Sequence, residues 1–92
     1  MRRATDAIAA LVPRQRTVVA GTIDSVVSCA DPWVRTDAVL ADETGALVLR
    51  FMGRAAVPGI KAGACLVAEG TAALERGAFV MRNPLYSFAT AS

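Results

Sequence analysis

Apolar and polar residues alternate along most of this chain, and glycine and proline interrupt the alternation at short intervals. A period of two is the pattern of a β-strand that buries one face. It predicts five strands, which cover residues 16–28, 34–41, 46–52, 64–74 and 78–83. Gly21, in the interior of the long first strand, indicates a bend or a bulge.

The alternation also separates the faces of each strand. The residues that share one face are Val19, Gly21, Ile23 and Val27, then Val34, Thr36, Ala38 and Leu40, then Leu47, Leu49 and Phe51, then Leu66, Ala68 and Gly70, and last Phe79 and Met81. In the third strand the outward residues are Val48, Arg50 and Met52. An arginine on that face is either solvated or part of a binding groove.

The segments between the strands have the composition of turns. Residues 42–45 predict a tight hairpin turn with Gly45 at a position of positive φ, and residues 75–77 predict a second hairpin. The longest interruption, residues 53–63, contains Pro58, Gly59 and Gly63 and has room for at most one helical turn.

An amphipathic pattern precedes the first strand. Residues 1–13 predict a short helix that Thr5 or Asp6 caps and Pro13 ends. Its apolar stripe is Ile8, Leu11 and Val12. We therefore expect an N-terminal helical extension over residues 1–15, a β-domain over residues 16–88 and a loose tail over residues 89–92.

Five short strands at this spacing, the first long and bent, predict an all-β fold, a small closed or half-closed antiparallel barrel. A chain of 92 residues forms one domain at most, and its 54% of hydrophobic residues can build a core. No apolar run approaches a membrane span and no signal peptide is recognisable, so we expect a cytoplasmic protein with no membrane partner.

Cysteine and charge add little to this picture. Cys29 and Cys65 are far apart in the sequence, and we expect both thiols to be free and buried or half-buried. The net charge of +2 and the pI of about 8.9 permit a nucleic-acid partner without requiring one. Lys61 is the only lysine, so nearly all positive charge is arginine.

The common sequence patterns of catalytic sites are missing. The chain has no histidine, so no ordinary catalytic triad is available to a serine or cysteine. Asp42 and Glu43 are adjacent, but neighbouring turn residues point apart, and no third ligand accompanies them. Phosphate-binding glycine loops are absent. We expect no enzyme activity, no metal site and no cofactor.

The runs DETGALVLRFMGR, VPGIKAGACLVAEGTA and RGAFVMRNPLYSF together resemble the small OB-fold domains of bacteria, including the single-strand-binding and anticodon-binding types. The resemblance covers roughly residues 16–88. It implies a Greek-key OB-fold barrel. It also implies a binding surface on the second and third strands, between the loop after the first strand and the loop between the fourth and fifth.

Carried onto this chain, the resemblance implies a nucleic-acid-binding site made of Trp33, Arg35, Val48, Arg50, Arg76 and Arg82. Single-strand binders stack bases on aromatic residues, and here only Trp33 is available for that role. The implied partner is single-stranded DNA or RNA, held weakly.

Alternatives remain open at this point. Arg50 could simply pair with Asp37 over the sheet, and Trp33 could cap a barrel end. Tyr86 is expected to pack against the barrel. The domain could instead be a protein-interaction adaptor or a homodimer. It would then use the N-terminal helix or an apolar outer face formed by Val18, Val39, Val48 and Met52.

Overall fold

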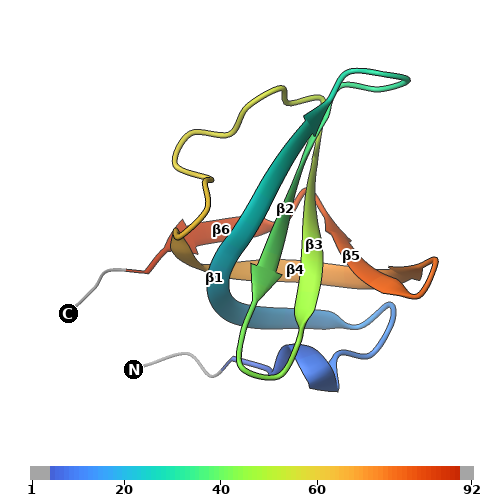
Figure 1. Cartoon of the computed structure of the whole chain (residues 1–92). Coiled ribbons are helices and arrows are strands. Elements are labelled where there is room, and N and C mark those ends of the chain that lie inside the picture. The colour runs from blue at the N-terminus through green and yellow to red at the C-terminus, as the bar shows by residue number, and fades with distance from the viewer. Residues whose placement is uncertain (1–4, 90–92) are drawn as a thin grey trace.

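A computed structural model of the chain describes residues 5–89, and its strands form a closed barrel (Figure 1). One 3-10 turn, η1, precedes six strands. The elements are η1 (Ile8–Ala10), β1 (Arg16–Cys29), β2 (Arg35–Ala41), β3 (Ala46–Met52), β4 (Cys65–Glu75), β5 (Ala78–Arg82) and β6 (Leu85–Phe88).

The barrel closes because β1 belongs to both of its sides. The first half of β1 pairs with β4 and the second half with β2, and the order β1-β2-β3-β5-β4 leads back to β1 (Figure 1). All pairs are antiparallel except β3 with β5, which run parallel. The predicted five-stranded barrel is confirmed, but the expectation that all of its pairs are antiparallel is wrong for β3 and β5.

Gly21 lies where β1 passes from one side of the barrel to the other. A Cβ atom at this position would lie 2.4 Å from the carbonyl oxygen of Ala41, so no larger residue fits. A bulge between Ile23 and Ser25 follows and shifts the register of β1 against β2. The prediction that Val27 shares the face of Ile23 is therefore wrong, since Ile23 is buried and Val27 is exposed.

Aliphatic side chains fill the barrel, as the shortage of aromatic residues requires. Among the largest fully buried side chains are Ile23, Leu40, Leu47, Leu49, Leu66 and Met81. Val57 and Ile60, from the connection between β3 and β4, are also buried, and the amide of Ile60 donates to the carbonyl of Val57. That connection contains no helix, only turns. Phe79, predicted to point inward, is half-buried and packs against the core.

β6 was not predicted from the sequence. It pairs with the first half of β4 on the edge where β5 pairs with the second half. The register slips by one residue between them, at Asn83 and Pro84. Tyr86 of β6 packs its ring edge-on against Phe51, with centroids 5.5 Å apart, so the expected packing of Tyr86 on the barrel is confirmed.

The N-terminal helix is much shorter than predicted. Within the described residues only Ile8–Ala10 is helical, and Ala7 rather than Thr5 or Asp6 precedes it, without a side-chain cap. Asp6 accepts hydrogen bonds from the Thr17 hydroxyl and the Val18 amide instead, which ties the segment to β1. Residues 1–4 of the predicted helix and residues 90–92 of the predicted tail lie outside the described residues.

The turn between β2 and β3 is closed by a carboxylate. Oδ1 of Asp42 accepts from the Thr44 amide at 2.7 Å and the Gly45 amide at 3.0 Å, and Oδ2 accepts from the Ile8 amide at 2.9 Å. Gly45 is not among the residues of positive φ, so that prediction is wrong. The Asp42 carboxylate fixes this turn and holds the N-terminal segment against it.

Two smaller findings complete the fold. Cys29 and Cys65 are both free, and Cys29 is half-buried, but Cys65 is exposed, contrary to expectation. Its Sγ lies 3.5 Å from the hydroxyl of Thr22. Among the described residues, no helix is long and apolar enough to cross a membrane.

Candidate functional site

Three rows of side chains cross the outer face of β2, β3 and β5. The strand registers align Asp37 with Arg50 and Arg50 with Arg82 in the middle row. An apolar row lies on one side of it and consists of Val39, Val48 and Val80. On its other side Arg35 pairs with Met52. Strand alternation alone places these residues on one face, because each lies two residues from the next along its strand.

Arg50, at the centre of the middle row, uses both edges of its guanidinium. Its Nε and Nη2 donate to the two carboxylate oxygens of Asp37 at 3.0 and 3.2 Å, and its Nη1 donates to Oε1 of Glu75 at 3.2 Å. The side chain is only 17% exposed. The hydrogen bonds with Asp37 raise the pKa of Arg50, while burial acts in the opposite direction, so the group is permanently charged.

The pairing continues on both sides of Arg50. The other carboxylate oxygen of Glu75 accepts from Nη2 of Arg82 at 3.0 Å. Nε of Arg35 lies 3.4 Å from Asp37 but has no hydrogen-bond partner among the described residues, although the atom is buried. The result is one chain of alternating charge, Arg35–Asp37–Arg50–Glu75–Arg82.

This chain of charges borders a depression of about 390 Å³. Its lining residues are Arg35, Val48, Arg50, Glu75, Arg76, Ala78 and Val80. We call the depression and its five-residue ion-pair chain the arginine groove. Its four arginines face two carboxylates, so the groove keeps an excess of positive charge.

Arg76 reaches the groove because the β4–β5 hairpin is tight. Glu75 pairs with Ala78, which leaves Arg76 and Gly77 as a two-residue turn. Their φ values of 52° and 83° are both positive, as in a type I′ turn. Gly77 adopts this conformation at little cost, and the turn holds Arg76 at the rim of the groove.

Trp33 lies in the loop between β1 and β2, two residues before Arg35. The loop is anchored to the end of β3, because the Gly53 amide donates to the Val34 carbonyl at 2.7 Å. Trp33 is 67% exposed and does not belong to the buried core, so it does not cap the barrel. It is an aromatic surface beside the first residue of β2.

The residues predicted from the sequence are thus partly brought together. Arg35, Val48, Arg50 and Arg76 line the groove, Arg82 joins it through Glu75, and Trp33 lies outside the lining. The sequence reading missed Glu75 as a partner of two arginines. The only signal for it was its place directly before a two-residue turn. The Arg50–Asp37 pair, considered as an alternative, is present.

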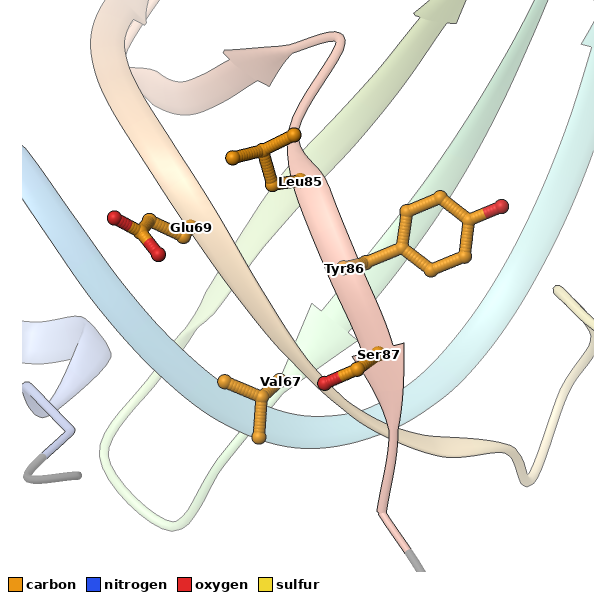
Figure 2. Close-up of a pocket in the computed structure, with 5 residues that line it drawn as sticks. All are labelled: Val67, Glu69, Leu85, Tyr86 and Ser87. Carbon is orange, nitrogen blue, oxygen red and sulfur yellow. The ribbon is translucent and has the colours of Figure 1, made fainter. Parts of the chain in front are cut away.

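The apolar outer face predicted from the sequence is not exposed. Val18, Val39, Val48 and Met52 are all half-buried. A second depression, of about 340 Å³, lies over β4 and β6 and is lined by Val67, Glu69, Leu85, Tyr86 and Ser87. In Figure 2, Tyr86 points away from the side of β6 on which Ser87 lies. Leu85 is 64% exposed, and the Glu69 carboxylate pairs with Arg16 at 3.1 Å.

Comparison with known proteins supports the architecture. The chain is similar to the OB domain, residues 67–166, of MM0293 from Methanosarcina mazei, a solution NMR structure. The match has a TM-score of 0.73 at 13% sequence identity and covers 95% of this chain and 84% of that chain. No protein-family model and no curated protein matches the chain. At this identity the likeness shows the fold alone, and the barrel is an OB fold.

Proposed function

We propose that this OB-fold domain is a non-catalytic binding module that holds single-stranded DNA or RNA weakly along the arginine groove. The observation that carries the proposal is that three arginines, from β2, β3 and the β4–β5 hairpin, line one depression, while Arg82 of β5 pairs with the lining residue Glu75. Guanidinium groups recognise phosphate oxygens by charge and by paired donors.

The groove offers the three kinds of contact that a single strand uses. The exposed Arg76 and the partly exposed side chain of Arg35 are the positively charged groups for phosphates. The half-buried Val48 and buried Val80 give an apolar floor. The exposed indole of Trp33 offers a face on which one base can stack, a contact worth about 1–3 kcal/mol. One aromatic residue supports weak binding with little sequence preference.

No catalytic step is part of the proposal. The chain lacks histidine, and the two carboxylates of the groove are committed to guanidinium groups. Within residues 5–89 no three candidate metal ligands come together. The role that we propose for the groove is therefore binding alone.

The salt dependence of binding tests the proposal. With phosphates at Arg35 and Arg76, log K for a labelled oligothymidylate of about 12 nucleotides should fall against log salt with a slope of about −1.4. Arg76→Ala should reduce that slope by about 0.7. Arg54→Ala removes the same charge from the β3–β4 connection and should change neither the affinity nor the salt slope. The groove proposal fails if the slope is near zero or if both variants behave alike.

A second candidate function has its own observation. The depression over β4 and β6 is lined by the exposed Leu85 and the half-buried Val67, and its charged lining residue, Glu69, pairs with Arg16 (Figure 2). An exposed apolar patch favours a protein partner or a second copy of the chain. Sedimentation of the parent and of Leu85→Lys separates the two functions. A dimer that the substitution dissociates would favour the adaptor, and a monomer that binds oligonucleotide favours the groove.

A further inference from the structure

Glu75 bridges the two guanidinium groups at the middle of the arginine groove. One of its oxygens lies 3.2 Å from Nη1 of Arg50 and the other lies 3.0 Å from Nη2 of Arg82. A planar anion with two oxygens, each facing one guanidinium, makes the contacts that a phosphate group would make with the same pair. The position between these two guanidinium groups is therefore already occupied by a carboxylate.

We propose that Glu75 is a built-in competitor for a phosphate-binding position between Arg50 and Arg82, and that it limits how tightly the groove holds a polyanion. The inference rests on the proposed function, because it names an additional phosphate site within the same groove. A backbone phosphate enters this site only when the Glu75 carboxylate turns out into solvent.

The exposure of the partners makes this exchange feasible. The side chains of Glu75 and Arg82 are 32% and 60% exposed. Ion pairs this close to solvent contribute little to stability, because water solvates the separated charges nearly as well. Glu75 is also the last residue of β4, directly before the two-residue turn, so its side chain can swing outward without disturbing a strand.

Asp37 has the opposite role. It holds Arg50 through the Nε and Nη2 edge with both of its oxygens, in a bidentate pair. Asp37 is thus a positioning residue that keeps the Nη1 edge of Arg50 pointed at the site, whichever anion occupies it. The two carboxylates of the groove differ in function because one orients the arginine and the other covers it.

Replacement of Glu75 by glutamine tests the inference, because the amide keeps the shape of the side chain and removes its charge. Against the same labelled oligothymidylate at about 50 mM salt, Glu75→Gln should bind roughly fivefold more tightly than the parent. Its salt slope should be steeper by about 0.7, the increment of one further phosphate. Glu43→Gln makes the same change of charge in the β2–β3 turn and should bind like the parent.

The possible outcomes separate the inference from the proposed function. If the parent binds the oligothymidylate and Glu75→Gln binds it with the same affinity as Glu43→Gln, or more weakly than the parent, Glu75 is not a competitor. The proposed function of the groove is then unaffected. If neither the parent nor any variant binds, the proposed function itself fails. Glu75→Ala should move affinity and slope in the same direction as Glu75→Gln, so the inference remains testable if one variant does not fold.

Discussion

The guanidinium of Arg50 has two donor edges, and the barrel uses both of them. One edge meets Asp37 and the other meets Glu75. Truncation of Arg50 would leave two neighbouring carboxylates without their shared partner, so it would change stability and ligand binding together. At the residue scale a cleaner probe of binding is a side chain with few internal contacts, and Trp33 is such a residue.

Trp33→Ala should lower the affinity for a single-stranded oligonucleotide by about 1–3 kcal/mol, because one base loses its stacking partner. The salt slope should stay that of the parent, since stacking releases no counterions. Trp33 is the only tryptophan, so quenching of its emission reports the contact in the parent. Constant emission during the titration, or unchanged affinity in the variant, would exclude stacking on this residue.

At the scale of elements, two carboxylates hold the N-terminal segment on the barrel. Asp6 accepts from Thr17 and Val18 of β1, and Asp42 accepts from Ile8 of η1 and closes the β2–β3 turn. Asp42 also accepts a hydrogen bond from the Thr44 hydroxyl. The hydrogen bonds to Asp42, that one most of all, lower its pKa from an ordinary value of 3.8 to about 2. The segment is therefore attached by charge-assisted bonds that acid weakens.

Asp42→Asn should cost about 1 kcal/mol of unfolding free energy at pH 7, because a neutral amide accepts these hydrogen bonds less strongly. The pKa of Asp42 is lower in the folded state, so its contribution is complete above the unfolded pKa. It is lost as the pH falls from about 4 to 2. Urea unfolding across this range should show the parent and the variant converging.

Glu43→Gln is the matched control for this prediction. Glu43 is the neighbouring exposed residue of the same turn, so its replacement should leave the unfolding free energy unchanged at every pH. If the difference in unfolding free energy between the parent and Asp42→Asn stays constant down to pH 2, the carboxylate charge is not what stabilises the turn.

At the scale of the whole molecule, strand alternation was enough to predict the barrel and the side of it that carries the arginines. Arg35 and Arg50 needed only a period of two to be placed outward on neighbouring strands. Predictions from alternation were wrong where a bulge or a register slip interrupts the period of two. The bulge after Ile23 places Val27 on the exposed face, and the register slip at Asn83 and Pro84 is why the four-residue β6 was not predicted.

Charge pairing was harder to predict than strand position. Glu75 and Arg50 are 25 residues apart in the sequence. They meet because β5 pairs in parallel with β3 and also pairs with β4, and no local pattern encodes the long-range β3–β5 pairing. The prediction of an N-terminal helix was wrong for a related reason. Its capping candidate Asp6 found tertiary partners on β1, and these replaced the local cap.

The most direct test of the account maps the ligand on the barrel by titrating ¹⁵N-labelled protein with an unlabelled single-stranded oligonucleotide and following amide and side-chain N–H shifts. The groove predicts the largest changes at the Trp33 indole, at Arg35 and Arg50, and at Arg76 in the β4–β5 hairpin. Residues over β4 and β6, such as Val67 and Leu85, should stay unperturbed. Changes confined to Val67 and Leu85, or no changes at any oligonucleotide concentration, would contradict the claim that the arginine groove binds single strands.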